Sequence, residues 1–372
     1  MQASDFFVDS DITKAHTLPA VVYNDKKIWI FVMENLFMDS MQFAGGDEIW
    51  PGETNCAPFS FLPGLVNEPL LFVRDGLSKE LCMSNVCTHR GKLLVEQPGK
   101  HNMISCGYHG RCFRLDGSFK SMPEFESVQN FPAESDNLRH FSIERLGVFR
   151  FVSLNSVINE NSFIKKIVST IPSFAFDKLQ FEVSLSADYE VKAHWLAYCD
   201  NYLEGFHIPF VHKTLNEKIS YEDYRVQCFD QCSVQVADAR PGEESIRLNN
   251  SDMDFGKDIY AYYWFCYPNT MINIYAWGVS VNVVLPVSRN KTRILFRTYL
   301  LPGTDPEKFR NTALHQTEME DEAIVESVQK GLKSGVYSRG RFSPTREQAV
   351  HAFHKYLSDV LSRFKNEEKN FQ

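Results

Sequence analysis

Two short motifs constrain this chain more than any other feature of its sequence. The first is Cys87-x-His89 in VCTHRGKLL, and the second, after sixteen intervening residues, is Cys106-x-x-His109 in SCGYHGRCF. A disulfide needs no histidine, and zinc fingers usually group Cys with Cys and His with His. Here each motif pairs one thiolate with one imidazole, so together they predict a group that binds both sulfur and nitrogen ligands.

A Rieske [2Fe–2S] cluster uses this mixture, because two Cys hold one iron and two His replace Cys on the other. Gly91, Gly107 and Gly110 beside the motifs allow sharp turns and leave N–H groups free to face sulfur. A structural zinc site and two unrelated buried Cys–His pairs are the alternatives, and both account less well for the spacing. The four predicted cluster ligands are Cys87, His89, Cys106 and His109.

A second constellation lies in DNYLEGFHIPFVHKTLN. Glu204 precedes His207 by three residues, which predicts that both lie on the same side of a helix. His212 follows, and we expect Pro209 to disrupt the helix so that both imidazoles converge. Two His and one carboxylate with open positions form the facial triad of non-haem Fe(II) oxygenases, so a mononuclear iron site is predicted.

The third iron ligand is predicted from the helical segment HQTEMEDEAIVESVQKGL. Its carboxylates are Glu318, Glu320, Asp321, Glu322 and Glu326. Its predicted apolar face consists of Ile324, Val325, Val328 and Leu332. On a helical projection Asp321 falls near the centre of this face, Glu318 nearer its edge and Glu326 almost opposite. Because a charge directed into a core needs a partner or a metal, Asp321 is predicted as the ligand, with Glu320 and Glu322 in solvent.

Length and composition limit the class of protein. A chain of 372 residues exceeds one ordinary core, so two domains are expected. A net charge of −8 argues against a nucleic-acid partner, and no apolar run approaches the roughly 18 residues of a membrane span. The N-terminus lacks the pattern of a secretory signal, and nine scattered cysteines favour a reducing cytoplasm over a disulfide framework.

The pattern of helix-forming and strand-forming residues changes along the chain. Residues 1–37 contain the helix-like KKIWIFVMENLF and are expected to pack with the second domain. Residues 38–155 are rich in β-formers, as in PLLFVRDG and LGVFRFVSL, with RDG and LDGS as hairpin turns. Residues 156–372 contain antiparallel strands followed by long helices near 306–332 and from about 345, so an α+β architecture is predicted.

Several segments resemble the aromatic-ring-hydroxylating oxygenase α-subunit family. NVCTHRGKLL and CGYHG…LDG are similar to its Rieske domain, and DNYLEGFHIPFVH to its N-x-x-(D/E)-x-x-H-x₄-H motif. With the Trp195 region and ESVQKGLKSG, the resemblance covers nearly the whole chain. It implies an α+β protein: a small all-β Rieske domain, then an antiparallel-sheet helix-grip (START-like) catalytic domain with C-terminal helices. One departure is Arg111, where many relatives have Trp, close to the cluster ligands.

The resemblance also implies roles for site residues. His207, His212 and Asp321 would bind the mononuclear iron, Asn201 stands where the family has a polar residue near the iron, and Glu204 stands at the bridging position. In the family this bridge joins a Rieske histidine of one subunit to the iron site of its neighbour, which implies a head-to-tail homotrimer.

The two predicted centres together imply an oxygenase. An Fe(II) site with open positions binds O₂ beside a substrate, and a Rieske cluster supplies single electrons for its reductive activation. By resemblance, His109 would pass the electron to Glu204 and then to His207. Because the chain has no G-x-G-x-x-G unit, a separate NAD(P)H-dependent flavin/iron-sulfur reductase is expected as a partner.

The substrate is predicted from resemblance. Glu at position 204, where ring dioxygenases commonly have Asp, is similar to carnitine and choline monooxygenases and betaine-type demethylases, which implies hydroxylation or demethylation of a small quaternary ammonium compound. Seven aromatic residues offer a cation-binding cage or simply core: Tyr262, Tyr263, Trp264, Phe265, Tyr267, Tyr275 and Trp277. An oxygenase of aromatic compounds is the alternative, and a Rieske electron-transfer protein without oxygenase activity is the alternative of a different class.

Overall fold

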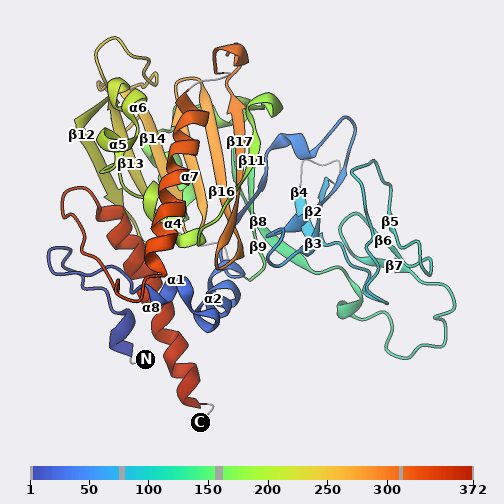
Figure 1. Cartoon of the computed structure of the whole chain (residues 1–372). Coiled ribbons are helices and arrows are strands. Elements are labelled where there is room, and N and C mark those ends of the chain that lie inside the picture. The colour runs from blue at the N-terminus through green and yellow to red at the C-terminus, as the bar shows by residue number, and fades with distance from the viewer. Residues whose placement is uncertain (1–2, 75–79, 156–161, 310–312, 371–372) are drawn as a thin grey trace. The chain divides into compact units, whose positions relative to one another are not determined.

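The computed structural model describes residues 3–74, 80–155, 162–309 and 313–370, without the side chains of 313–316 and 365–370. The chain divides into two compact units (Figure 1). The larger unit combines residues 1–38 with 160–372, and the smaller unit consists of residues 39–159. The smaller unit is therefore an insertion between the N-terminal segment and the rest of the larger unit.

The smaller unit contains a six-stranded antiparallel sheet in the order β1-β9-β8-β4-β3-β2 and a three-stranded sheet, β5-β6-β7. Its strands are β1 Gln42–Gly45, β2 Cys56–Phe61, β3 Glu68–Arg74, β4 Glu80–Ser84, β5 Ile104–Ser105, β6 Cys112–Phe113, β7 Phe119–Ser121, β8 His140–Leu146 and β9 Phe149–Ser153. Two short 3₁₀ turns, η3 Asp47–Ile49 and η4 Glu134–Asp136, complete it.

The predicted turn at LDGS is confirmed. Gly117 has a φ of 81° and donates its N–H to the Arg114 carbonyl at 3.0 Å, which joins β6 to β7. The predicted RDG turn lies at the edge of the gap at residues 75–79, outside the described residues, although the strands β3 and β4 beside it pair antiparallel. The core beneath these strands includes Val73, Phe113 and the two motif cysteines.

The larger unit contains an eight-stranded antiparallel sheet and most of the helices. Its strands are β10 Gln180–Phe181, β11 Ala187–Val191, β12 Ile219–Cys228, β13 Cys232–Ala239, β14 Ile259–Cys266, β15 Thr270–Tyr275, β16 Gly278–Ser288 and β17 Lys291–Leu300. Its α-helices are α1 Val21–Asn24, α2 Lys26–Val32, α3 Phe163–Thr170, α4 Trp195–Tyr202, α5 Ile208–Val211, α6 Lys213–Lys218, α7 Ala313–Leu332 and α8 Gln348–Asn370. Shorter turns are η1 Ala3–Phe6, η2 Met33–Phe37, η5 Phe176–Lys178, η6 Val183–Leu185 and η7 Pro306–Phe309.

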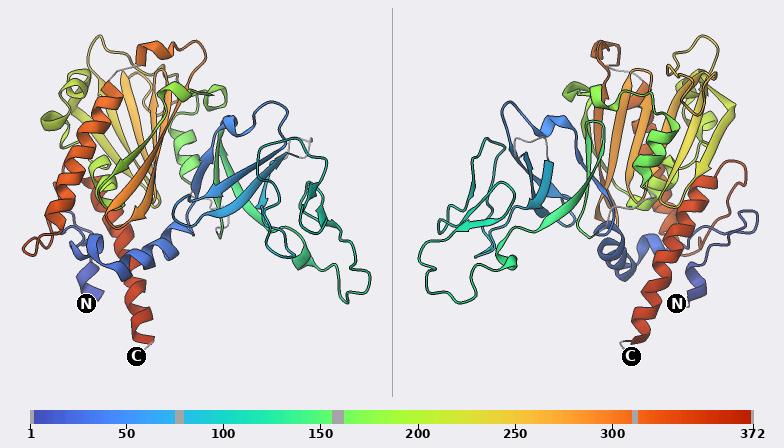
Figure 2. Two further views of the ribbon diagram at one scale, coloured as in Figure 1. Left: turned by 45° about the vertical axis from the view of Figure 1, so that its right-hand side comes forward. Right: turned by 180° about the vertical axis from the view of Figure 1, so that it is seen from behind.

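Strands β12 to β17 follow one another as a meander, and β10 and β11 both pair with β17. Helices α4 and α7 lie against one face of this sheet in both views (Figures 1 and 2). The tight turn into β16 requires glycine, because at Gly278, with a φ of 153°, a Cβ would lie 2.1 Å from the Tyr299 carbonyl oxygen. The strands of this sheet and the helices α4 and α7 together line one cavity.

Residues 1–38 bind the C-terminal part of the larger unit. The Ala20 N–H donates to the Ser338 carbonyl at 2.8 Å, and the Leu18 N–H donates to His354 Nδ1 at 3.0 Å. The helix predicted from KKIWIFVMENLF is confirmed as α2 with the π-helical turn η2. Among the described residues, none of the helices has the combined length and apolar character that crossing a membrane requires.

Candidate functional site

A turn between two helices positions the predicted bridging carboxylate. Helix α4 ends at Tyr202, so Glu204 and His207 do not share a helix, and that prediction is wrong. Instead the Glu204 carboxylate accepts the His207 N–H at 3.0 Å and His207 Nδ1 lies 2.6 Å from it. Pro209 falls in the first turn of α5, where a missing N–H costs little, so it begins a helix rather than disrupting one.

The three predicted iron ligands meet at one point. His207 Nε2 and His212 Nε2 lie 3.1 Å apart, and Asp321 Oδ1 lies 3.0 Å from His212 Nε2 and 3.5 Å from His207 Nε2. Within the described part of the chain, these three residues are the one group of three or more His, Cys, Asp or Glu whose ligand atoms all lie within 4.8 Å of one another. We call His207, His212 and Asp321 the triad.

Each imidazole of the triad is held from behind by a carboxylate. His207 Nδ1 faces Glu204 and His212 Nδ1 faces Glu320, at 2.6 and 2.8 Å. A proton on each Nδ1 leaves the Nε2 lone pairs directed at each other across 3.1 Å, which is repulsive unless a cation lies between them. The donor set therefore fits a metal ion, with the carboxylate–histidine–metal order common in such sites.

The prediction of which face of α7 is buried is wrong in part. Ile324 and Val328 are 42% and 46% exposed, whereas Glu318 and Gln329 are buried together with Val325. The buried stripe is thus centred near Glu318, and Asp321 lies about 60° from that centre, at its edge. From this edge Asp321 reaches both imidazoles.

The placement of Glu320 in solvent is also wrong, because Glu320 bonds His212. Glu322 is partly buried rather than solvated, and burial raises its pKa. Sequence reasoning missed Glu320 because it lies outside any apolar stripe. Its position beside the predicted ligand was the one available signal.

Two further groups complete the polar surroundings. Asn201 Nδ2 donates to Asp321 Oδ1 at 2.8 Å, while its Oδ1 is buried with no hydrogen-bond partner among the described residues. Burial lowers the pKa of His212, but Asp321 and Glu320 outweigh it, so the pKa is raised. Burial raises the pKa of Glu318 to about 8, although the Tyr198 hydroxyl bonds its carboxyl group.

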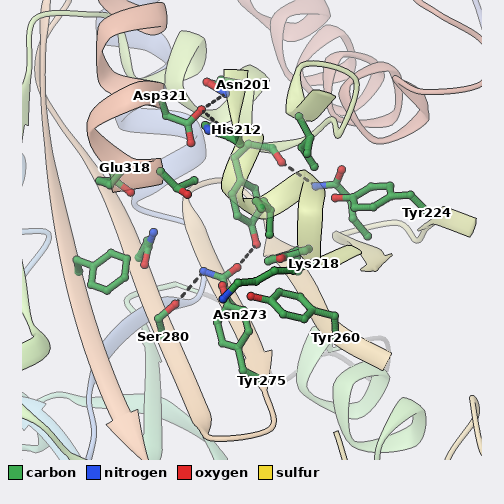
Figure 3. A pocket seen from close by; sticks show the side chains of 18 of the residues that line it. Asn201, His212, Lys218, Tyr224, Tyr260, Asn273, Tyr275, Ser280, Glu318 and Asp321 are labelled. Carbon is green, nitrogen blue, oxygen red and sulfur yellow. Dashed lines mark hydrogen bonds and ion pairs between the residues drawn. The ribbon is translucent and has the colours of Figure 1, made fainter. Parts of the chain in front are cut away.

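The triad lies at the wall of a cavity of about 260 Å³ in the larger unit (Figure 3). Nine Tyr, Trp and Phe side chains line it: Tyr198, Tyr202, Tyr224, Tyr260, Tyr263, Tyr275, Trp277, Phe296 and Phe309. Tyr275 and Trp277 stack with ring centroids 4.8 Å apart. Charged groups also line it, among them Lys218, Glu243, Glu244 and Glu318. Of the seven aromatic residues considered from sequence, Tyr262, Trp264, Phe265 and Tyr267 do not line the cavity and are buried elsewhere.

In the smaller unit the two cysteine motifs form loops with the same hydrogen bonds. The Cys87 N–H donates to the carbonyl five residues later at 2.8 Å, and the Cys106 N–H does the same. In each loop a glycine in the left-handed region, Gly91 or Gly110, donates its N–H back to the cysteine carbonyl. Both cysteines are buried, and the rings of the two motif histidines lie 4.9 Å apart.

These loops direct polar hydrogens at the sulfurs. Burial raises the pKa of Cys87. At Cys106 burial acts in the same direction, but the N–H groups of Tyr108 and His109 and the Cys87 thiol outweigh it and lower the pKa. Among the described residues, the four motif side chains do not form a single-ion group like the triad, so their arrangement fits a two-iron cluster better than one zinc ion.

Arg111 follows the second motif and is only 2% exposed. Its guanidinium bonds the Asp136 carboxylate at 2.7 Å and lies 5.0 to 5.6 Å from the centres of three phenylalanine rings. The planar guanidinium of Arg111 therefore packs among three aromatic rings next to the loop, in a space that the flat ring of a Trp would also fill.

Two family models match this chain. Residues 61–132 match the Rieske [2Fe-2S] domain family, and residues 179–363 match the catalytic domain of the ring hydroxylating alpha subunit family. The carnitine monooxygenase oxygenase subunit of Escherichia coli (strain K12) is 27% identical, covering 94% of each chain. The chloroplastic choline monooxygenase of Beta vulgaris is 27% identical, covering 93% of this chain and 77% of the relative.

Solved structures show the same fold. A quaternary ammonium Rieske monooxygenase in complex with L-carnitine superposes with a TM-score of 0.74 at 21% identity, covering 97% of this chain and 99% of that chain. Naphthalene 1,2-dioxygenase from Rhodococcus sp. superposes with a TM-score of 0.71 at 15% identity, covering 93% of this chain and 94% of that chain. The predicted α+β architecture, with a Rieske domain and an antiparallel-sheet catalytic domain, is confirmed.

Proposed function

Because the chain belongs to the Rieske non-haem iron oxygenases, as an α-subunit with a Rieske and a ring-hydroxylating catalytic domain, we propose that it oxidises a small quaternary ammonium compound. The protein is an oxidoreductase that uses a Rieske cluster and a mononuclear iron. The alternatives of a zinc protein and of an electron-transfer protein without oxygenase activity are therefore wrong.

We assign the cofactor ligands residue by residue. Cys87, His89, Cys106 and His109 hold the Rieske cluster, and the triad holds Fe(II). When bound, these groups supply single electrons and open coordination positions for O₂ beside the substrate. The experiment is iron and acid-labile sulfide analysis, with three irons per chain expected and two per chain contradicting the mononuclear site.

The side chains around the triad orient its ligands. Glu204 and Glu320 accept the Nδ1 protons of His207 and His212, which fixes both rings with Nε2 toward the site. Asn201 holds Asp321 by donating to Oδ1, so this carboxylate keeps one oxygen close to both imidazoles. Glu204, Glu320 and Asn201 therefore each form a hydrogen bond with one residue of the triad and orient it.

The observation that carries the substrate proposal is the aromatic lining of the triad's own cavity. Aromatic faces attract quaternary ammonium groups, and the carboxylates of Glu243 and Glu244 add negative potential at the same cavity. The similar proteins from Escherichia coli and Beta vulgaris are named for carnitine and choline. With an added reductase and NADH, we expect O₂ uptake that depends on at least one of choline, carnitine and glycine betaine, and none with a panel of aromatic acids.

A second candidate is an oxygenase of aromatic compounds. The stacked pair Tyr275 and Trp277 offers a flat apolar surface that an aromatic ring also fits, and naphthalene 1,2-dioxygenase shares the fold. O₂ uptake with aromatic acids and none with the three ammonium compounds would favour this candidate.

We also propose a head-to-tail homotrimer in which His109 of one subunit passes electrons to Glu204 of the next. Glu204 is supported in this role by its contact with His207 and by two neighbouring rings, Phe206 and Phe210, that are 44% and 75% exposed. Exposed aromatic rings beside a functional residue are typical of a binding surface. Light scattering should give three times the 42.9 kDa chain mass, and Phe210→Asp should reduce it.

The remaining proposals concern the electron source and the compartment. Turnover with NADH should require an added flavin/iron-sulfur reductase, and activity of the isolated chain would contradict that. A reducing cytoplasmic location is supported by the nine cysteines, which are all free of disulfides.

A further inference from the structure

Lys218 lines the triad's cavity and is the last residue of α6. Its side chain is half-buried and is directed into the cavity (Figure 3). A second lysine, Lys308, also lines the cavity, but it is exposed. An ammonium group held inside a substrate cavity is unexpected if the substrate is simply a cation, because like charges repel.

The Lys218 ammonium has no hydrogen-bond or ion-pair partner among the described residues. Three carboxylates of the lining, one buried and two half-buried, are already engaged: Glu318 with Tyr198, Glu204 with His207, and Asp321 with His212. A partly buried charge is stable only when water, hydrogen bonds or an opposite charge compensate it. The other carboxylates of the lining, Glu243 and Glu244, form no ion pair with Lys218 among the described residues, so the ammonium is left to water or to a bound anion.

A neutral donor of the same cavity also lacks an acceptor. The Tyr260 hydroxyl lines the cavity and also has no hydrogen-bond partner among the described residues. Asn273, by contrast, is fully engaged, since it accepts from Tyr202 at 2.6 Å and donates to Ser280 at 3.0 Å. A carboxylate suits an ammonium that lacks an acceptor, because the charge-assisted hydrogen bond is stronger than a neutral one.

We propose that Lys218 binds the carboxylate of the substrate, so that the substrate is a zwitterion with a quaternary ammonium group at one end and a carboxylate at the other. This inference rests on the proposed function for the cationic end. The cavity presents both signs of charge, the Lys218 ammonium and the Glu243 and Glu244 carboxylates. Lys218 thus selects betaine-type acids over amino alcohols such as choline.

The test measures ligand binding on the iron-loaded protein under anaerobic conditions, by isothermal titration with glycine betaine, L-carnitine, γ-butyrobetaine and choline. Lys218→Met should weaken binding of the three carboxylates about tenfold to hundredfold, the usual value of a hydrogen bond to a charged group. Choline binding should change less than about twofold. Lys218→Arg should keep most of the affinity, because it retains the charge. Lys178→Met, an exposed lysine that does not line the cavity, is the matched control.

Other results would contradict the role of Lys218 or the proposed substrate class. Equal Kd values for wild type and Lys218→Met with every carboxylate would overturn the role of Lys218, as would an equal loss for choline. A loss in Lys308→Met instead would overturn it in favour of that lysine. If wild type binds none of the four compounds, the proposed substrate class fails. Should Lys218→Met unfold, Lys218→Gln and Lys218→Arg provide the same comparison.

Discussion

Removing the Glu320 carboxylate should weaken iron binding although Glu320 does not touch the metal position. Glu320 Oε2 lies 2.8 Å from His212 Nδ1, and this bond fixes the ring that directs Nε2 toward Asp321. Without it the buried His212 ring, 2% exposed, keeps its place, but its Nδ1 loses its acceptor. We expect Glu320→Ala to leave the fold intact and to lower the affinity for Fe(II).

The size of the effect follows from two independent considerations. Outer hydrogen bonds to a metal-binding histidine typically change metal affinity by about tenfold to hundredfold. That range corresponds to about 1.4 to 2.7 kcal/mol, which agrees with about 1.5 to 3 kcal/mol for a hydrogen bond to a charged group. Because Glu320 is 30% exposed, solvent screens part of the interaction, and we expect the lower half of the range.

The assay is an anaerobic titration of iron-depleted protein with Fe(II) against a competing chelator. Glu320→Ala should weaken binding by about tenfold to thirtyfold, and Glu320→Gln by less, because its amide oxygen still accepts from Nδ1. Glu322→Gln, two residues along α7, is the control, because Glu322 forms no hydrogen bond with a triad residue among the described residues. Equal iron affinity in wild type and Glu320→Ala would refute the positioning role of this carboxylate.

Four further substitutions test other features. Asp321→Ala should lower the iron content from three to two per chain while acid-labile sulfide stays constant. Because the pKa of Glu318 is raised to about 8 from 4.5, the folded chain holds a proton between these pH values that the unfolded chain releases, so the free energy of unfolding falls as the pH rises. In iron-depleted wild type this free energy should fall by about 2 kcal/mol between pH 6 and 7.5. Thermal unfolding of Glu318→Gln should not show this fall. Arg111→Met removes the ion pair with Asp136, which keeps its hydrogen bond from the Ala133 N–H, and should destabilise the smaller unit by about 2 kcal/mol, seen as a lower melting temperature of the visible cluster absorption. Gly278→Ala should destabilise the larger unit by at least about 3 kcal/mol, and a melting temperature equal to wild type would contradict the close strand contact.

The sequence allowed the local chemistry to be predicted because the relevant residues lie within short spans. The alternation of buried and half-buried residues along β17 and the turn at Gly117 also depend only on residues adjacent in the sequence. His207 and His212 are five residues apart, so any short turn brings them close. Asp321 was predicted from an apolar face that is partly exposed in the structure, and it reaches the two imidazoles from the edge of the buried stripe instead.

The details that were wrong depend on tertiary packing. The rotation of α7 is set by what covers it, and the structure exposes Ile324 and Val328 while burying Glu318. No helical projection distinguishes these outcomes, because apolar and acidic residues alternate around this helix. Similarly, Glu204 meets His207 through a turn closed by backbone N–H groups, which has no periodic signature.

The insertion of the smaller unit has a consequence for biosynthesis. Residues 39–159 are contiguous, so this unit has all its strands soon after they leave the ribosome, and it can fold and take up its cluster early. The N-terminal segment must wait, because Leu18 and Ala20 bond residues more than three hundred positions later. Cluster assembly would then precede completion of the iron site, and a chain stalled before Asp321 is added would already hold its coloured cluster but lack the third residue of the triad.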